Sequence, residues 1–477
     1  MIKEDPFLGR KENIKTISNF FKSDKDAAAL IYGRRRVGKT FLVKEFFDNR
    51  FSFYATGVDN VKLSEELEYF NDSLMEYGSK ETDCPKSWRE AFNRLKHLLM
   101  NDTILRDPIT NKRIIFLDEL PWMDTPRSNF RSALDYFWNS WASAQKDIIM
   151  IVCGSATSWI ISNILSDKGG LYNRITRQIH LIPFTLGECK KFFDANNIII
   201  SKDDIITSYM VFGGIPYYLD LFSRRLSLTQ NIDALIFNEN GQLHYEYNRL
   251  FKSLFKNAEK HYAIINSLAK KRGGLTRTEI IKDTKIGDGK HLTETLEELE
   301  QCGFIRKYKN FVKDKTNAYF QIIDPFTLFC HTFLLNGKIN SWIKYIRTPA
   351  YNSWSGLAFE IVCLLHTAQI KHALGISGVD SFEYAWRSEK SSPGAQIDLV
   401  IDRMDNVINL CEAKHSNQKY SLDAKVADNL SNKLNAFQNE TKSKKALHLT
   451  MICSNGLSYN NYSSIVTNEI TGEDLFS

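Results

Sequence analysis

The segment from Gly33 to Thr40, with the sequence GRRRVGKT, constrains the fold more than any other part of the chain. It fits the pattern G-x-x-x-x-G-K-[ST], in which glycines let the backbone turn around a phosphate while a new helix adds its positive end. The apolar run 28–32 predicts a strand before the loop, and residues 41–47 predict a helix after it. This order favours a nucleoside triphosphate as ligand, with Lys39 at the β- and γ-phosphates and Thr40 at Mg²⁺.

The composition is that of a globular protein with several domains. A length of 477 residues predicts about three domains, and 43% of the residues are hydrophobic. The net charge of +6 is compatible with a nucleic-acid partner without requiring one. The eight cysteines are scattered without a C-x-x-C pair, which favours buried thiols over disulfides or a zinc site. We find no signal peptide and no apolar stretch near the ~20 residues that span a bilayer, so we expect a soluble, cytoplasmic protein without a membrane partner.

Alternating strand and helix patterns predict an α/β multidomain chain that begins with a parallel sheet. The expected strands of this sheet are 28–32, 51–55, 113–117, 148–152 and 178–181. The expected domains are a P-loop core at 1–184, a helical lid at 185–258, a winged helix-turn-helix at 259–335, a linker at 336–352 and a second α/β domain at 353–477.

The run 113–119 is an apolar strand that ends in two carboxylates, as in the Walker B pattern. Asp118 would hold Mg²⁺ through water, and Glu119 would polarise the water that attacks the γ-phosphate. Ser155, after the strand 148–152, is either a polar sensor of the γ-phosphate or a plain turn residue. Arg174 either stabilises charge in the transition state or forms a surface ion pair. Pro216, in the turn 213–219, either closes a lid on the nucleotide or only connects two helices.

The middle region predicts three helices and a hairpin, the winged helix-turn-helix pattern. The helices are expected at 261–271, from 276, and at 290–302, with Asp288 as cap of the third and Gly303 at its end; the hairpin is 304–308 with 319–323. The wing is basic, through Arg306, Lys307, Lys309, Lys313 and Lys315. The third helix carries Glu294, Glu297, Glu298 and Glu300, which oppose binding to phosphates. We therefore favour a domain that packs between the two ends of the chain over a DNA-binding domain. Contacts of the wing with DNA or RNA are left open.

The last domain contains a pattern of acids and one lysine that suits phosphodiester hydrolysis. Asp398 lies in the strand 396–401, and Glu412 and Lys414 share one face of the strand 409–414, which can pair with the first across the turn 403–406. Asp398 and Glu412 suit Mg²⁺, Lys414 suits water and the scissile phosphate, and Glu360 could add a ligand from a helix. The alternative is a strand pair with a surface Glu–Lys pair, although a lone carboxylate in an apolar strand is costly.

The first half of the chain resembles the archaeal and bacterial ATPase family of the STAND branch of AAA+ proteins. The resemblance rests on the motifs at 7–12, 33–40, 117–119, 153–155, 172–174 and 213–219. It implies ATP as ligand, usually as a switch, an N-terminal segment at adenine and a lid that senses nucleotide. Asn173 stands where the family more often has Gly. The residues expected at the nucleotide are Gly9, Arg10, Gly33, Arg34, Arg35, Arg36, Val37, Gly38, Lys39, Thr40, Asp118, Ser155, Arg174 and Pro216.

The end of the chain resembles the PD-(D/E)XK nuclease-like domain, a restriction-endonuclease-like fold, that occurs fused to this ATPase family. The resemblance implies Asp398, Glu412 and Lys414 as the catalytic triple and Glu360 as an accessory acid, with Gln396 where other members often have Glu. Our leading hypothesis is an ATPase that controls a Mg²⁺-dependent nuclease acting on DNA or RNA, with a homo-oligomer left open. The alternatives are an ATP-dependent switch or DNA-binding regulator that does not cleave, and a constitutive ATPase with a scaffolding domain.

Overall fold

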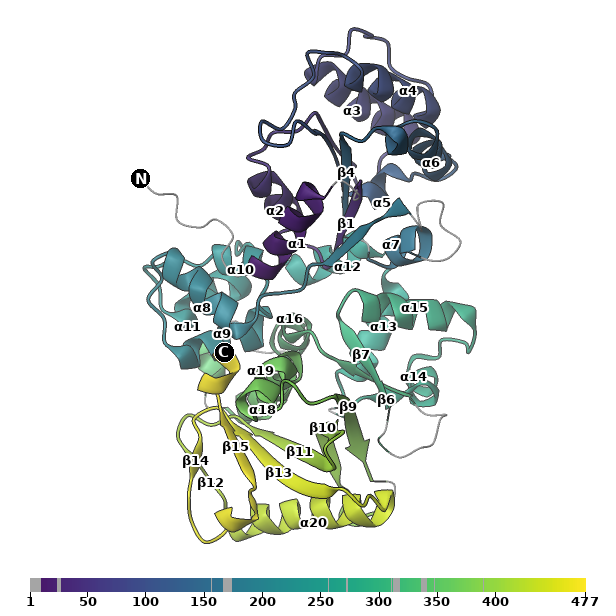
Figure 1. The fold of residues 1–477 in the computed structure, drawn as a ribbon. Helices are drawn as coiled ribbons and strands as arrows, with labels where there is room; N and C mark the ends of the chain where they lie inside the picture. Colours follow the sequence, from purple (N-terminus) through teal and green to yellow (C-terminus); the bar gives the residue numbers. More distant parts are fainter. Residues whose placement is uncertain are drawn as a thin grey trace. The chain divides into compact units, whose positions relative to one another are not determined.

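The computed structural model describes residues 10–23, 27–155, 157–165, 174–255, 257–271, 273–309, 311, 318–335, 341–346, 348–388 and 390–477 (Figure 1). The chain divides into two compact units, Met1–Pro183 and Phe184–Ser477, and each unit is described by itself. Among the described residues, no helix combines the length and the apolar character that crossing a membrane requires.

The first unit is built on a parallel sheet with the strand order β2-β3-β4-β1-β5. The strands are β1 (Ala28–Tyr32), β2 (Phe53–Thr56), β3 (Arg113–Asp118), β4 (Ile148–Gly154) and β5 (Arg177–His180). Every residue of β3 and β4 is buried, which explains their unbroken apolar sequence. The predicted parallel sheet is confirmed, although the second strand begins at Phe53 and not at 51.

Helices cover both faces of this sheet (Figure 1). They are α1 (Lys11–Lys22), α2 (Lys39–Phe46), α3 (Leu63–Glu76), α4 (Trp88–Leu99), α5 (Leu120–Met123), α6 (Phe130–Ser140) and α7 (Thr157–Ile160). One face packs against α3, α4 and α6 through a cluster that includes Phe70, Trp88 and Phe137. On the other face, the rings of Phe47 and Phe116 both contact Phe51. A sheet buried on both sides leaves its carboxyl-end edge as the place for a ligand.

The second unit begins with helices that fill the predicted lid. They are α8 (Leu186–Ala195), α9 (Lys202–Phe212), α10 (Pro216–Asp220), α11 (Leu228–Ile232) and α12 (Glu246–Leu254). Thr185 caps α8, because its hydroxyl accepts from Glu188 N while the Glu188 carboxylate accepts from Thr185 N. The sequence signature S/T-x-x-E thus marks where the lid helices start.

The middle region has the helices and the hairpin that the sequence predicts. Its elements are α13 (Glu259–Leu268), β6 (Leu275–Thr276), α14 (Arg277–Thr284), α15 (Lys290–Gln301), β7 (Ile305–Lys309) and β8 (Ala318–Ile322), and the sheet order is β6-β8-β7. The prediction that Asp288 caps the third helix is wrong. Gly289 is the N-cap of α15, and the Asp288 carboxylate instead pairs with Arg277 at 2.7 Å.

The segment predicted as a linker, 336–352, contains packed helix in its described part. Here lie α17 (Trp342–Tyr345) and the start of α18 (Pro349–Leu365), between α16 (Pro325–Phe329) and α19 (Thr367–Ala373). Trp342 is buried, with its ring 5.1 Å from Phe329 and 5.4 Å from Trp354 between centroids. These aromatic contacts tie the segment to its neighbours, which a solvated linker would not need.

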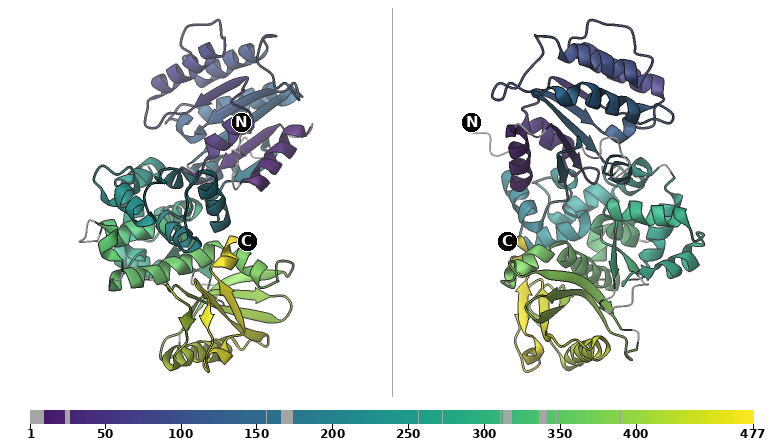
Figure 2. Two further views of the ribbon diagram at one scale, coloured as in Figure 1. Left: turned by 90° about the vertical axis from the view of Figure 1, so that its left-hand side faces the viewer. Right: turned by 45° about the vertical axis from the view of Figure 1, so that its right-hand side comes forward.

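The C-terminal region forms a mixed sheet of order β15-β13-β11-β10-β9. Its strands are β9 (Ser381–Arg387), β10 (Gln396–Arg403), β11 (Val407–Lys414), β13 (Ala446–Cys453) and β15 (Asn468–Thr471), beside the short pair β12 (Tyr420–Ser421) and β14 (Leu457–Ser458). The predicted hairpin is confirmed, since β10 and β11 pair antiparallel with Leu399 opposite Cys411. Helix α20 (Ala424–Thr441) lies along one face, where Phe437 packs with Val400 and Leu410 (Figure 2).

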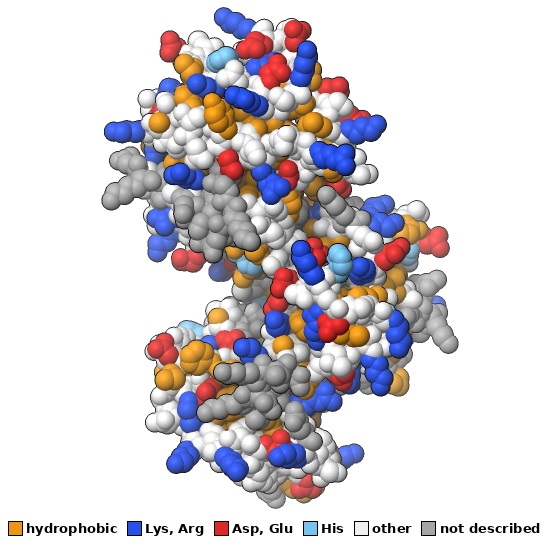
Figure 3. All heavy atoms as spheres, turned by 90° about the vertical axis from the view of Figure 1, so that its right-hand side faces the viewer, with side chains coloured by type: hydrophobic (Ala, Val, Ile, Leu, Met, Phe, Trp, Pro, Cys, Tyr) orange, Lys and Arg blue, Asp and Glu red, His pale blue; other side chains and the backbone are white. Residues whose placement is uncertain are grey.

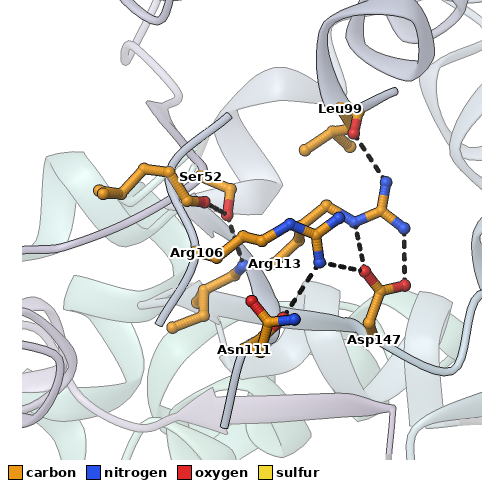
Figure 4. A network of polar contacts seen from close by, with 8 residues as sticks. Ser52, Leu99, Arg106, Asn111, Arg113 and Asp147 are labelled. Carbon is orange, nitrogen blue, oxygen red and sulfur yellow. Dashed lines mark hydrogen bonds and ion pairs between the residues drawn. The ribbon is translucent and has the colours of Figure 1, made fainter. Parts of the chain in front are cut away.

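A polar network ties together the starts of β3 and β4 (Figure 4). The Asp147 carboxylate accepts from Arg113 Nε at 2.8 Å and Nη2 at 2.6 Å, and from Arg106 Nη1 at 2.7 Å. Arg113 also donates to the Leu99 carbonyl at 2.7 Å. Burial opposes ionisation of Asp147, but the hydrogen bonds from both arginines outweigh it and lower the pKa of this carboxyl.

Replacing Asp147 by Asn should destabilise the chain, because the buried Arg113 guanidinium then loses its anionic partner. We expect the free energy of unfolding at neutral pH to fall by about 1–3 kcal/mol. Since the folded-state pKa of Asp147 is lowered, its contribution exists at neutral pH and disappears as the pH falls below about 4, so the difference from wild type should shrink there. Urea titrations would measure it, with the exposed Asp102→Asn as the matched control. Equal stability of the two variants at neutral pH would contradict this account.

Candidate functional site

Residues 33–40 form a tight loop between β1 and α2. Gly33 and Gly38 have φ values of 146° and 90°, a region in which side chains with a Cβ are strained. A Cβ at Gly33 would also lie 2.2 Å from the Leu181 carbonyl oxygen. The two glycines therefore meet a geometric requirement of this loop, as the sequence pattern predicts.

Lys39 is buried in the first turn of α2 and donates to the carbonyls of its own loop. Its Nζ lies 3.1 Å from both Gly33 O and Arg34 O. Burial lowers the pKa of Lys39, and the charges of Glu119 and Asp118 oppose that shift. Neutral carbonyls are weaker acceptors for an ammonium than anionic oxygens are, so these residues fit a phosphate ligand.

Thr40 and Asp118 meet across the gap between α2 and the end of β3. Thr40 Oγ1 donates to Asp118 Oδ2 at 2.7 Å. Burial is the main cause that raises the pKa of Asp118, and the Thr40 hydrogen bond opposes it. A hydroxyl and a carboxylate oxygen held together are hard ligands that suit Mg²⁺ bound with a nucleotide, so this pair fits the cofactor that the sequence predicts.

Glu119 is held in place by Ser155. Glu119 has φ 45°, an uncommon left-handed conformation, directly after β3. Its Oε2 accepts from Ser155 N at 3.0 Å and from Ser155 Oγ at 2.7 Å. Ser155, which is buried directly after β4, thus contacts the carboxylate predicted to polarise water. This contact gives Ser155 more than the role of a plain turn residue.

The arginines near the loop have different surroundings. Arg10 is buried and donates to Val37 O at 3.0 Å and to Ile182 O at 2.8 Å, which ties the start of α1 to the loop. Gly9, its predicted companion, lies outside the described residues. Arg34 is buried, Arg36 is half-buried with φ 71°, and the Arg35 guanidinium lies 5.7 Å from the centroid of Trp122. Arg35 therefore contacts the helix that follows Glu119.

The last two residues predicted at the nucleotide are Arg174 and Pro216. Arg174 is exposed, and its motif partners Tyr172 and Asn173 lie outside the described residues. Pro216 belongs to the second unit, where it is the first residue of α10. The turn before it has Gly213 and Gly214 at φ 67° and 65°. A Cβ at Gly214 would lie 2.4 Å from Phe184 O, so this turn packs tightly inside its own unit.

The lid helices are joined directly to the C-terminal region. The Leu186 N–H at the start of α8 donates to His366 Nε2 at 2.9 Å, and His366 Nδ1 lies 2.8 Å from Val362 O on α18. Burial lowers the pKa of His366 to about 4, so at neutral pH its ring is uncharged and can accept the Leu186 bond. A Cβ at Gly187 would lie 2.4 Å from Phe476 O. A displacement of α8 would therefore act on the C-terminal region.

The C-terminal acids lie on paired strands, but each is already engaged. Asp398 lies where the pairing of β10 with β9 shifts register, and its Oδ1 accepts from Gln396 Nε2 at 2.6 Å. Glu412 accepts from Lys414 Nζ at Oε1 and from Lys433 Nζ at Oε2, both at 2.7 Å. Burial opposes ionisation of Glu412, yet the two lysine charges outweigh it and lower its pKa. Burial likewise opposes the charge on Lys414, but Glu412 raises the pKa of that ammonium.

Lys433 is a site residue that the sequence reasoning missed. It lies on α20, whose buried residues Leu430 and Phe437 and half-buried Leu434 mark the face toward the sheet. A lysine three residues after Leu430 falls on that apolar face. This exception to the helical pattern is the signal that could have identified it.

These residues, as they are arranged, do not fit a bound divalent cation. Both Glu412 oxygens are held by lysines, and Glu360 lies on α18, where its charge acts on Lys414 and Arg306. Across the described ranges, no three or more His, Cys, Asp or Glu side chains gather closely enough to hold a metal ion. The acid pattern is thus present on neighbouring strands without forming a metal centre.

The wing packs against the C-terminal region through its described residues. Arg306 Nη2 donates to Asp398 O at 3.3 Å, and its guanidinium lies 4.7 Å from the centroid of Tyr308. Phe311 N donates to Ala385 O at 3.1 Å, and the Phe311 ring lies 5.1 Å from Phe437. Lys307 and Lys309 are exposed, whereas Lys313 and Lys315 lie outside the described residues. Arg306 is therefore committed to an intramolecular contact, in keeping with a packing domain.

The helices of the middle region carry paired charges instead of a basic stripe. Lys270 pairs with Asp283 at 3.3 Å and Lys271 with Glu279 at 2.5 Å. On α15, Lys290 lies 3.5 Å from Glu294. Figure 3 shows basic and acidic side chains interspersed over this face of the molecule. Binding of a duplex would have to compete with these acids for the cations.

Comparisons with known proteins give one match to a family model and several to individual proteins. Residues 7–222 match the model of an ATPase domain predominantly from Archaea. The chain is 26% identical over 365 residues to an uncharacterized protein of Methanocaldococcus jannaschii, covering 75% of this chain and 76% of that protein. An uncharacterized ATP-binding protein of the same organism is 41% identical over 44 residues, 9% of this chain and 75% of that protein. The Walker-type ATPase of Pyrococcus abyssi aligns with TM-score 0.44 and 18% identity, covering 68% of this chain and 95% of that chain. The family match agrees with the loop geometry, and together they support a P-loop ATPase fold for residues 7–222.

The contact between Ser155 and Glu119 predicts different effects for two substitutions. Glu119→Gln should retain ATP binding and reduce hydrolysis by about 100-fold or more, because the carboxylate expected to polarise water is lost. Ser155→Ala should also retain ATP binding but reduce hydrolysis less, by roughly tenfold. Glu119 keeps its charge in this variant and loses only the hydrogen bond from the Ser155 hydroxyl. Steady-state phosphate release with nucleotide affinity measured in parallel would separate the two. Wild-type turnover in Ser155→Ala would show that the anchor is dispensable.

Proposed function

We propose that this chain is an ATP-dependent switch in which nucleotide at residues 33–40 controls a nuclease-like C-terminal domain that acts on nucleic acid. The observation that carries the proposal is the preformed Thr40–Asp118 pair beside the buried Lys39. It supplies the hydroxyl, the carboxylate and the ammonium that a bound Mg²⁺–nucleotide requires. Mg²⁺ bound with ATP would neutralise charge on the phosphates.

The residues of the nucleotide site have distinct roles in this proposal. Lys39 exchanges its carbonyl acceptors for phosphate oxygens when nucleotide binds. Glu119, anchored by Ser155, orients the attacking water. Arg174 would stabilise charge at the γ-phosphate, and Pro216 would belong to a lid that responds to nucleotide, as the family resemblance implies.

Transmission to the C-terminal domain has a physical basis within the second unit. The buried hydrogen bond from α8 to His366 and the close approach of Gly187 to Phe476 join the lid helices to the domain that bears Glu412. Packed contacts of this kind transmit a displacement instead of absorbing it. We propose that a lid movement driven by nucleotide changes the environment of the C-terminal acids.

We further propose that this C-terminal domain cleaves DNA or RNA. It is supported by Asp398, Glu412 and Lys414 on two paired strands. The rival is a domain that binds nucleic acid or a protein without cleaving it. That rival is favoured by the two lysines that hold both oxygens of Glu412.

The ATP part is tested by Lys39→Ala, which should abolish ATP binding because the phosphates lose their buried cation. Fluorescence titration with a labelled ATP analogue would measure affinity, with Lys15→Ala on the exposed side of α1 as the control. Unchanged affinity in Lys39→Ala would rule out residues 33–40 as the nucleotide site.

The nuclease part is tested by incubating plasmid DNA and RNA with Mg²⁺ or Mn²⁺, with and without ATP. We expect ATP-dependent cleavage by wild type and by Lys419→Ala, an exposed control, and at least about a 100-fold loss in Lys414→Ala. If wild type and Lys414→Ala behave alike on every substrate, the cleaving function is wrong. Nucleic-acid binding in fluorescence anisotropy without cleavage would then support the rival.

A further inference from the structure

The Glu412 carboxylate of the C-terminal site is paired by the protein's own cations. Glu412 has two cationic partners, and one of them comes from a different element, since Lys433 lies on α20 and Glu412 on β11. Three cationic side chains lie among the acids of this site: Lys414, Lys433 and Arg306 act on Asp398, Glu360, Glu383 and Glu412. A divalent cation at Glu412 would therefore meet two ammonium groups that already occupy its carboxylate oxygens.

The surroundings of Lys433 explain why it stays on Glu412. Its side chain is 17% exposed and that of Glu412 14% exposed. The two line a small cavity whose other walls include Ile397, Leu410, Leu430 and Leu434, which offer no polar side-chain atom. Attraction between unlike charges is stronger where water is partly excluded, so Glu412 is the natural partner for the ammonium in this cavity.

Lys414 and Lys433 differ in what they can do. Lys414 lies two residues from Glu412 on the same strand, so the backbone keeps its ammonium near the carboxylate. Lys433 reaches Glu412 from a helix through a four-carbon stem, and a change of rotamer can withdraw it. Its departure would free Oε2 of Glu412, whose charge acts on Asp398 of the paired strand β10.

We propose that the Lys433 ammonium stands in for a divalent cation at Glu412, so that the C-terminal site accepts a metal ion only when Lys433 leaves that carboxylate. The inference rests on the proposed function, because it concerns the same nuclease-like site. It explains how a chain can carry the acid pattern of a metal-dependent nuclease in an arrangement that does not fit the metal. Under this proposal, Lys433 limits cleavage of nucleic acid by keeping the metal ion away from Glu412.

The test is a titration of the full chain with Mn²⁺ in the absence of nucleotide. The electron paramagnetic resonance signal of free Mn²⁺ measures how much of the ion is bound. Lys433→Met keeps the stem and removes the charge, Lys433→Gln keeps a hydrogen-bonding end, and the exposed Lys425→Met on the same helix is the matched control. Removing one unit charge about 5 Å from a divalent ion should tighten binding by about tenfold or more, even at a water-like dielectric constant. We expect this gain in both Lys433 variants and none in Lys425→Met.

The double variant Glu412→Gln/Lys433→Met tests whether the additional Mn²⁺ binds at Glu412. If it does, this variant should bind Mn²⁺ no more tightly than wild type. If both Lys433 variants bind Mn²⁺ as wild type does, or if the gain survives in the double variant, the proposal is overturned. Thermal unfolding curves of each variant identify one that fails to fold, and the other Lys433 variant then decides. The comparisons of Lys39→Ala for ATP and Lys414→Ala for cleavage do not involve Lys433, so the failure of this inference is distinguishable from failure of the proposed function.

Discussion

The hydrogen bond between Thr40 and Asp118 joins the first turn of α2 to the end of β3, and the nucleotide site depends on it. It is possible only because the parallel sheet brings the ends of β1, β3 and β4 to one edge. The same edge carries Ser155, which anchors Glu119. Far from this edge, Asp147 holds two arginines and fixes the other ends of β3 and β4. The fold thus secures one end of the sheet and leaves the other for chemistry.

The two candidate sites differ in how their charges are satisfied. At the nucleotide site, the hydrogen-bond acceptors of Lys39 among the described residues are neutral carbonyls, so an anionic ligand improves its environment. At the C-terminal site, the lysine ammoniums already neutralise Glu412, so an incoming cation must displace one of them. The first site is prepared for its ligand and the second is closed by its own side chains. In the proposed function, the first site would receive nucleotide and the second would respond to it.

The sequence predicts what depends on neighbouring residues and misses what depends on distant ones. The loop at 33–40, the strand ending in Asp118 and Glu119, and the hairpin of β10 with β11 are encoded in continuous segments, and the structure contains all three. The contact of Lys433 with Glu412 spans 21 residues and that of Arg306 with Asp398 spans 92, so no continuous segment contains both partners. The pattern of α20 marks Lys433 as an exception on an apolar face but does not name its partner. The wrong cap at Asp288 has a similar cause, because its partner Arg277 lies on another helix.

The central claim is that nucleotide at residues 33–40 changes the state of the C-terminal domain. Amide hydrogen exchange of β10, β11 and α20 measures this directly, because those elements carry Asp398, Glu412 and Lys433. The account predicts that exchange in these elements differs between the ADP state and the state with a non-hydrolysable ATP analogue. It predicts no such difference when the same nucleotides are added to Lys39→Ala. Identical exchange in both nucleotide states of a wild-type chain that has bound both nucleotides would contradict it.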